Sequence, residues 1–201
     1  HFDIREANWL HLGDGYDLVV GLDKVFWGVA ESRHLVDIVN QNDQVEDLDG
    51  EDKLGQPMVQ LAFSQDWGTV TGFVLPGFRE RTFVGRDARL RGGLPIAGDD
   101  ETYDSNQEEH AVDLAIRYSH VIGDVDLGIS HFHGTSREPR LSVVSGARGL
   151  ELRPHYDQID QTGLDVQYTA DAWLWKFETI GRGGHGSYFG AAVAGVEYTL
   201  Y

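Results

Sequence analysis

The sequence predicts an all-β protein, specifically an antiparallel up-and-down β-barrel that spans a membrane. Segments of alternating apolar and polar residues recur along the chain, which is typical of strands with two different faces. Tight turns alternate with long polar connections, as they do in outer-membrane barrels with short periplasmic turns and long extracellular loops. The chain contains no run of eighteen apolar residues, so no transmembrane helix is predicted.

Four tight turns alternate with three long connections. The turns are expected at 13–15, 66–68, 122–124 and 170–172, and the long loops near 30–56, 79–108 and 135–158. A soluble sandwich has no reason to sort its connections so regularly by length. We therefore expect a single barrel domain over 1–201.

Four strands are expected in the N-terminal half, near 2–12, 16–29, 59–64 and 69–78. The first is the weakest, because Glu6 and Asn8 fall on its apolar face. The second and third alternate well; Val59, Leu61 and Phe63, for example, share one face. The fourth is apolar on both faces, which leaves its orientation open.

Five further strands are expected near 112–119, 125–130, 164–169, 173–178 and 192–200. The strand at 112–119 is the cleanest, with Leu114 and Ile116 opposite Ala115 and Arg117. The last strand carries small and apolar residues on one face. Nine is an odd number, whereas single-chain bacterial barrels use even numbers. We therefore expect part of the barrel to be missing, and the start at His1 suggests a processed or incomplete product.

Aromatic residues gather near the tight turns. Tyr and Trp prefer the membrane interface, where the ring is half buried and its polar atom meets water. Aromatics are also common in strands generally. Taken with the loop rhythm, the group predicts an aromatic girdle at one rim of the barrel. Its members are Tyr16, Trp67, Tyr118, Tyr168 and Trp173.

Charge and composition narrow the function. The chain has 33 acidic and 16 basic residues, a formal net charge of −17, which argues against nucleic-acid binding. This acidity fits a saline or cation-rich exterior, or bound divalent cations. There is no cysteine, so disulfides and thiolate metal sites are excluded.

Several stretches resemble porin-like outer-membrane barrels of Gram-negative, often marine, bacteria. They are Trp27-Gly28, 34–41 (HLVDIVNQ), 46–57 (EDLDGEDKLGQP), 78–81 (FRER) and 131–139 (HFHGTSREP). The resemblance covers most of the chain and implies a barrel in the cell outer membrane. It implies no particular substrate.

Charged residues are expected to line the pore. Fixed guanidinium groups recognise carboxylates and phosphates, so an arginine-rich loop that folds into the lumen would select anions. The alternative is an extracellular loop whose arginines pair with Glu80 and Asp87. Charged residues on the polar strand faces suit a water-filled lumen, although they would also suit plain solvent. The predicted lining set is Arg79, Arg81, Arg86, Arg89, Arg91, Asp113, Arg117, Asp126, Asp165 and Lys176.

The acidic stretch 43–52 is a candidate calcium site, because calcium prefers oxygen ligands. Its candidate ligands are Asp47, Asp49, Glu51 and Asp52. The spacing does not match an EF-hand loop, so a solvated acidic loop is the favoured interpretation and no cofactor is expected. The preceding stretch, 31–40, looks helical and is expected to plug or line the pore.

His131 and His133 share one strand face and continue its apolar side, which indicates the outer rim rather than a metal site. An outer-membrane hydrolase would need a nucleophile and base that converge, and Ser136 with either histidine is a weak pair. The sequence therefore predicts a non-enzymatic porin for passive diffusion of small polar or charged solutes. Outer-membrane lipids and further copies of the chain are its expected partners. The alternative is a soluble or surface β-sandwich that binds ligands such as glycans through its long loops.

Overall fold

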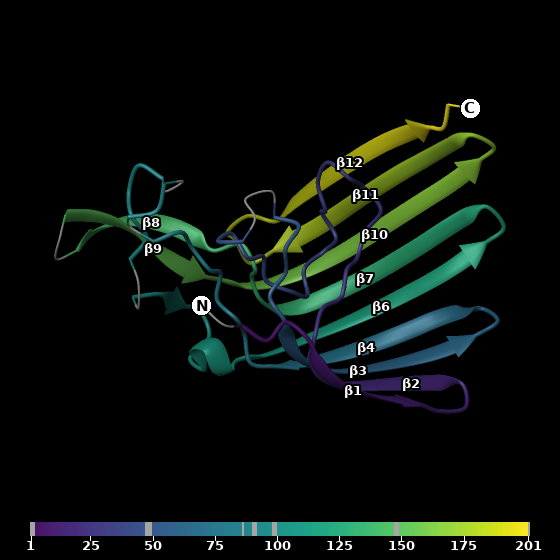
Figure 1. Cartoon of the computed structure of the whole chain (residues 1–201), viewed down its shortest axis with the longest axis horizontal. Coiled ribbons are helices and arrows are strands. Elements are labelled where there is room, and N and C mark those ends of the chain that lie inside the picture. The colour runs from purple at the N-terminus through teal and green to yellow at the C-terminus, as the bar shows by residue number, and fades with distance from the viewer. Residues whose placement is uncertain are drawn as a thin grey trace.

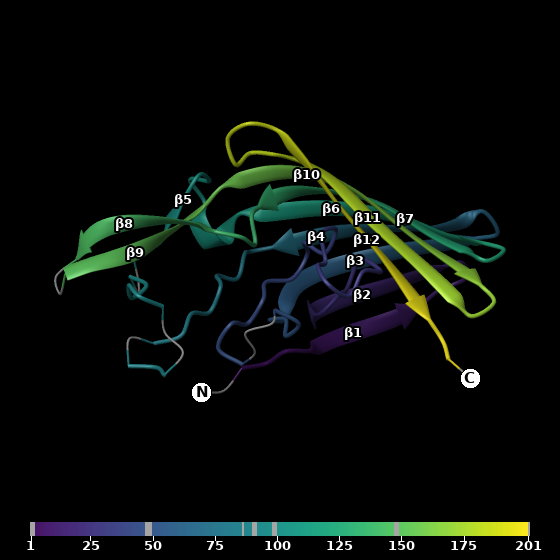
Figure 2. The same ribbon diagram turned by 90° about the horizontal axis from the view of Figure 1, so that it is seen from above.

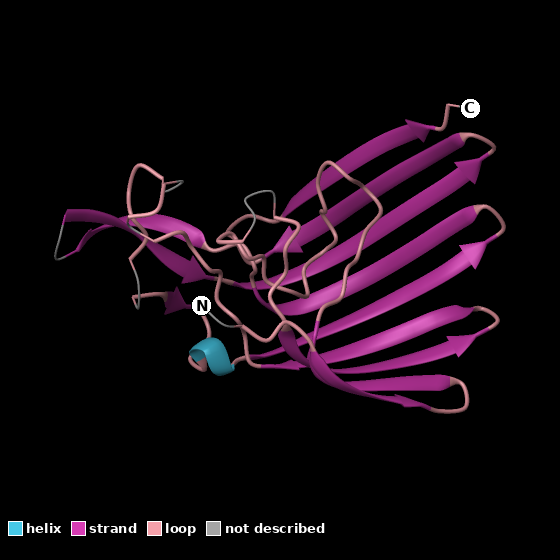
Figure 3. Ribbon diagram, viewed as in Figure 1, coloured by secondary structure: helices cyan, strands magenta, loops and turns pink. Residues whose placement is uncertain are grey.

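The computed structural model describes residues 3–46, 50–85, 87–89, 92–97, 100–146 and 149–200. These residues form one nine-stranded antiparallel sheet and one three-stranded sheet (Figures 1 and 3). The helical structure among them is one short 3-10 helix, η1 (Glu108–His110), and they contain no α-helix. The predicted all-β class and antiparallel sheet are therefore confirmed.

The large sheet contains β1 (Ala7–Leu12), β2 (Tyr16–Asp23), β3 (Gln56–Gln65), β4 (Gly68–Pro76), β6 (Val112–Ile122), β7 (Val125–Thr135), β10 (Gln158–Ala170), β11 (Trp173–Gly183) and β12 (Phe189–Tyr198), in that spatial order. These strands follow the nine expected segments in an up-and-down order. The four tight turns lie together at one end of the sheet, on the right in Figure 1. The long connections lie at the opposite end, which we call the loop end.

Two of the predicted loops contain regular structure. The small sheet consists of β5 (Thr102–Tyr103), β8 (Arg140–Gly146) and β9 (Gly149–Tyr156), with β9 in the middle. The stretches 79–108 and 135–158 do connect strands of the large sheet, but they also contain strands of their own, which alternation did not predict. Tyr156 is fully buried, and its ring contacts those of Phe78 and Tyr103, so aromatic packing joins the two connections.

The large sheet is open. Among the described residues β1 and β12 are its two edges, and they do not pair with each other. Figure 2 shows the sheet curving into a trough, with the chain between β2 and β3 lying in its hollow. We call the hollow side the concave face and the outer side the convex face.

The exposed convex face of the sheet is largely apolar, while the buried concave face carries polar and charged side chains beside the apolar ones of the core. We call this arrangement inverted polarity, because a water-soluble protein exposes mainly polar side chains and buries few charged ones. Exposed apolar side chains on the convex face include Val20, Val59, Phe63, Val74, Leu114, Ile116, Ile129, Tyr168, Trp175, Phe177 and Val196. Buried polar side chains on the concave face are Gln56, Asp113, Ser130, Gln161, Asp165, Lys176, Glu178 and Arg182. Cross-strand register keeps the two sets apart; Ile116, for example, lies opposite Gly72 and His131. Apolar surface of this extent marks a contact with membrane or protein.

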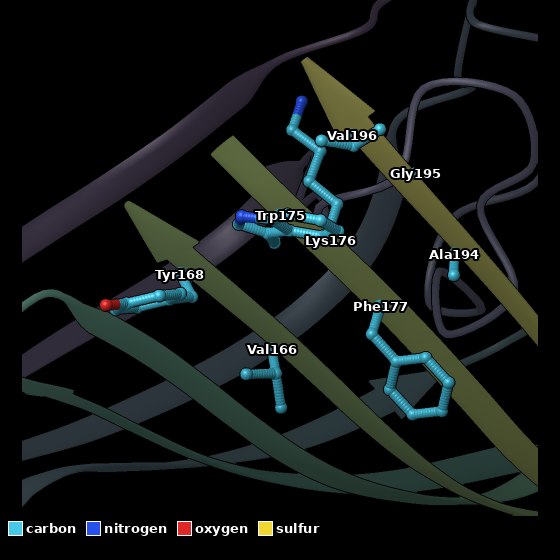
Figure 4. A pocket seen from close by; sticks show the side chains of 8 residues that line it. All are labelled: Val166, Tyr168, Trp175, Lys176, Phe177, Ala194, Gly195 and Val196. Atoms are coloured by element: carbon cyan, nitrogen blue, oxygen red, sulfur yellow. The ribbon is translucent and has the colours of Figure 1, made fainter. Parts of the chain in front are cut away.

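Figure 4 shows part of the convex face at β10, β11 and β12. Tyr168, Trp175, Phe177 and Val196 surround a shallow apolar hollow there. The hollow exists because β12 contributes small residues such as Ala194 beside the large rings of β11.

The structure also settles two uncertain strands. In β1, Trp9 lies opposite Val20 and therefore shares the convex face, whereas the sequence placed the apolar face on the residues in step with Asn8. In β4, Val74 is convex and exposed, while Phe73 and Leu75 are concave and buried. Both faces of β4 are apolar: the concave residues pack in the hydrophobic core, and Val74 belongs to the exposed apolar surface of the convex face.

That core lies between the concave face and residues 24–55, which we call the internal segment; its residues 47–49 lie outside the described chain. Trp27, Val36, Ile38 and Val39 are buried and pack against the concave side chains of the sheet. The sequence expectation of a helix at 31–40 was wrong, because these residues have no helical structure. The apolar residues of this stretch pack on the concave face of the large sheet.

Glu178 of β11 holds the internal segment against the wall. Its carboxylate is fully buried and accepts four backbone N–H bonds. Val29 and Ala30 donate to Oε1 at 2.7 and 2.8 Å, and Leu35 and Val36 donate to Oε2 at 2.7 and 3.3 Å. The side chain therefore satisfies backbone donors that a helix would have paired internally.

Two glycines make this close approach possible. Gly28 has φ +117°, and a Cβ there would lie 2.5 Å from Oε1 of Glu178. Gly163 of β10 leaves room for Val36, whose Cγ1 would be 2.9 Å from an added Cβ. The segment and the wall are therefore matched in shape as well as in hydrogen bonding.

We expect Glu178→Gln to loosen the internal segment. The amide nitrogen cannot accept hydrogen bonds, so two buried N–H groups lose their acceptor, at a cost of roughly 2–4 kcal/mol in the free energy of unfolding. Chemical denaturation measures this change. Glu197→Gln is the matched control, because Glu197 is an exposed acid on the concave side of β12 that pairs with Lys176. An equal loss in both variants would contradict the role assigned to Glu178.

Candidate functional site

A polar cavity of about 450 Å³ lies between the internal segment and the loop ends of β11 and β12. We call it the arginine cavity. The charged side chains in its lining are Arg33, Lys53, Arg81, Arg137, Arg182, Asp37, Glu51 and Glu138. Four of the five cations pair with a carboxylate, Arg33 and Arg182 with the same one, whereas Arg81 has no carboxylate at ion-pair distance among the described residues.

Arg137 follows β7 directly and is the most deeply buried of these cations, with 3% of its surface exposed. Its guanidinium lies 5.1 Å from the ring centroids of both Phe78 and Phe132. Nη1 donates to Asp113 at 2.6 Å and to the Thr135 carbonyl at 2.7 Å, and Nε donates to the Val39 carbonyl at 2.9 Å. Among the described residues Nη2 has no hydrogen-bond partner.

Arg81 enters the cavity from the connection after β4. It donates from Nε to Gln41 at 3.2 Å and from Nη2 to the carbonyl of Arg137 at 2.7 Å. Burial lowers the pKa of Arg81, and Glu138 opposes this shift only in part. Within the described part of the chain no carboxylate lies at ion-pair distance from Arg81.

Glu138 lies among several cations. Arg33 donates to Oε1 at 3.1 Å, and Arg182 donates to Oε2 at 2.6 Å. Burial raises the pKa of Glu138, but the hydrogen bond and charge of Arg182, with the charges of Arg33 and Arg81, lower it overall. The carboxylate is therefore held ionised by an arginine pair.

Five predicted lining residues do lie on the concave face, but mostly in ion pairs. Arg117 and Asp165 form a bidentate pair with both distances at 2.8 Å, and the Arg117 guanidinium lies 5.6 Å from the Trp27 ring centroid. Asp113 pairs with Arg137. The two remaining residues contact neighbours on the same face: Lys176 contacts Glu31 and Glu197, and Asp126 accepts a bond from Gln167.

The predicted arginine loop divides into different environments. Arg81 alone among its described members lines the arginine cavity. Arg79 instead pairs with Asp3 and donates to the carbonyl of Gly55, and Arg89 is exposed. Arg86 and Arg91 lie outside the described residues.

In the described part of the chain, the predicted calcium ligands do not form a site. Asp47 and Asp49 lie outside the described residues. Glu51 contacts Nε2 of His34 at 2.8 Å, and the backbone of Asp52 bonds to Asp43. Among the described residues, the carboxylate and imidazole groups that converge most closely belong to a different cluster, Asp104, His155 and Asp157. Arg140 already binds Asp157, so that cluster is balanced by an existing cation.

Three cavity arginines and Glu138 were missed in the sequence. Arg182 had a partial signal, because it lies in step with Lys176 and Glu178 along β11, although apolar Ile180 interrupts that polar face. Arg33, Arg137 and Glu138 lie in connections without periodicity, so alternation could not place them.

Ser136 is fully buried at the loop end, next to a histidine other than the two considered from sequence. Its Oγ lies 2.9 Å from Nε2 of His185, and Oδ2 of Asp157 lies 3.6 Å from the same nitrogen. In a hydrolase triad the acid contacts the second ring nitrogen, so this arrangement differs from one. His131 and His133 lie on the convex face, bonded to Thr162 and Asp160.

Comparisons with protein-family models, with curated proteins and with solved structures gave no match. In the described chain no helix has the length and apolar character needed to cross a membrane.

We expect His185 to make stability pH-dependent. Burial lowers the pKa of His185, and this outweighs the opposite effect of Asp157 and Glu138; Arg182 and Arg140 also lower it. The unfolded chain therefore binds a proton more readily, so stability falls as pH drops through the ordinary histidine range, near about 6.5. Chemical denaturation between about pH 8 and about pH 5 should show a flatter profile for His185→Gln than for the wild type.

The control for this measurement is His110→Gln, because the His110 side chain is strongly exposed. Its profile should follow that of the unmodified protein. A His185→Gln profile with the original slope would contradict the assignment.

Proposed function

We propose that the chain forms the wall of an outer-membrane β-barrel pore for passive diffusion of small polar or charged solutes. The observation that carries this proposal is the inverted polarity of the nine-stranded sheet. Lipid-facing apolar residues alternating with lumen-facing polar residues are the signature of transmembrane barrels. In water, the same arrangement would leave a broad apolar surface exposed and bury charged groups, both at a cost.

The turn-end aromatics support a membrane setting. Tyr16, Tyr118, Tyr168 and Trp173 lie on the convex face near the tight turns, and Trp67 lies in one of these turns. Trp67 stacks on Tyr118 with ring centroids 6.2 Å apart. Such a row suits the interface between lipid and water, and it would place the tight turns on the periplasmic side.

A soluble ligand-binding sandwich fits less well. In a sandwich, two sheets pack their apolar faces against each other. Here the covered face carries buried charged and polar side chains beside the apolar ones of the core, and its cover is the internal segment. The three-stranded sheet projects from the loop end rather than facing the large sheet (Figure 1).

The proposal requires the open sheet to close in the membrane. Unpaired backbone groups at a sheet edge are too costly in hydrocarbon, where water cannot bond them. The edges of β1 and β12 would therefore pair with each other or with further strands in the assembled barrel.

Conductance is the direct test. We expect reconstituted protein in a planar bilayer to give stable open steps, with a reversal potential under a salt gradient that indicates anion preference. The reason is that Arg81, which has no carboxylate partner among the described residues, lines the cavity together with four other cations. A reversal potential of the opposite sign would assign selectivity to the acidic residues. Folded protein that never conducts would contradict the pore.

A substitution on the convex face separates membrane from water. Ile116 is 51% exposed, so Ile116→Arg should be nearly neutral in a soluble protein. Facing lipid, it should destabilise folding by about 2–4 kcal/mol. Urea titration of protein folded into phosphatidylcholine vesicles measures this difference.

Val143→Arg is the matched control, since Val143 is equally exposed but belongs to β8 of the projecting sheet. It should change the stability in vesicles by less than about 0.5 kcal/mol. Equal effects of the two substitutions, or monodisperse protein in plain buffer, would count against membrane insertion.

A further inference from the structure

We propose that the arginine cavity binds a small oxyanion, a carboxylate or a phosphate, with Arg81 and Arg137 as anchors and Glu138 as an internal competitor. The inference deepens the proposed pore and rests on it for the route by which the anion arrives. The binding geometry itself depends only on the fold around the internal segment.

Arg137 provides a donor that is fixed in place. Stacking between Phe78 and Phe132 and the three bonds to Asp113, Thr135 and Val39 hold the guanidinium in one orientation. Nη2 remains without a partner among the described residues. Buried polar groups in native proteins are nearly always bonded, so an unpaired buried nitrogen on a residue that lines the cavity points to a ligand that approaches from there.

Arg81 adds a cation that no carboxylate neutralises within the described residues. Because Nη2 of Arg81 binds the backbone of Arg137, the two residues are joined at one side of the cavity. Burying a cation without a counter-ion is costly. An oxyanion beside Arg81 would offset that cost and gain charge-assisted hydrogen bonds.

Glu138 shows that this cavity accommodates a carboxylate. Arg33 and Arg182 share its two oxygens, so two cations are balanced by one acid. Lys53 already pairs with Asp37 and Arg137 with Asp113. The cavity therefore keeps a local positive excess around Arg81, and Glu138 competes with a soluble anion for the same guanidinium groups.

The size of the cavity limits the ligand. A volume of about 450 Å³ admits phosphate or a short carboxylic acid together with water, and excludes polymers. Guanidinium forks suit both anions, so phosphate and acetate are the two probes.

Isothermal titration calorimetry on the folded full chain in detergent micelles tests the site with each probe. We expect Arg81→Gln to weaken binding by about tenfold or more, because it removes a charge-assisted donor. Glu138→Gln should strengthen binding about threefold, because it removes the competing charge. Arg89→Gln is the matched control: it removes the same charge from an exposed part of the same connection, and binding should stay unchanged.

Opposite responses to Arg81→Gln and Glu138→Gln distinguish a local site from a general loss of structure. Arg81→Lys keeps the charge without the fork and should bind with intermediate affinity if the site is intact. The proposal is overturned if neither probe binds, if Arg89→Gln weakens binding as much as Arg81→Gln, or if Glu138→Gln weakens it.

The binding experiment tests the anion site and the conductance experiment tests the pore, so either proposal can fail without the other. Protein that binds phosphate with this variant pattern but carries no current would retain the site and contradict the pore. Protein that conducts but binds neither probe would retain the pore and contradict the site.

Discussion

The Glu178 carboxylate ties the internal segment to the sheet, and the arrangement of the concave face depends on that attachment. Four backbone N–H groups from two turns of the segment converge on one buried side chain. A buried carboxylate without such donors would be strongly destabilising, and so would the four N–H groups without an acceptor. Each partner therefore makes the burial of the other possible, which brings Trp27 and Val36 onto the wall.

Inverted polarity explains why an internal segment is needed at all. A curved sheet with charges on its hollow side must either fill that side with water or supply partners for every charge. The protein combines the two solutions. Near the middle of the sheet Arg117 and Asp165 neutralise each other beneath Trp27. At the loop end the pairing is incomplete, and the arginine cavity remains there. The cavity is therefore confined to the end where the connections are long.

Much of the fold could be predicted because alternation reports directly on which face a residue occupies. Leu114 and Ile116 lie on the same face in the sequence pattern and in the sheet. Alternation cannot assign the faces of a strand that is apolar on both sides, as β4 is. Phe73 lies on its concave face and packs in the core beneath the internal segment, so no charged residue of β4 marks that face. Alternation also fails for β8 and β9, which pair with each other outside the main sheet and whose residues follow no membrane-like pattern.

The site was harder to predict because its charges come from connections. Clustering of arginines in the sequence drew attention to Arg81, which lines the arginine cavity, but nearby Arg79 pairs with Asp3 instead. Residues that are far apart in the sequence meet in the cavity. The side chain of Arg81, for example, donates a hydrogen bond to the backbone carbonyl of Arg137. Such contacts depend on how two long connections fold over one sheet end. Sequence patterning can identify the two faces of the sheet, whereas the residues that line its cavity follow from how the long connections pack over its concave face.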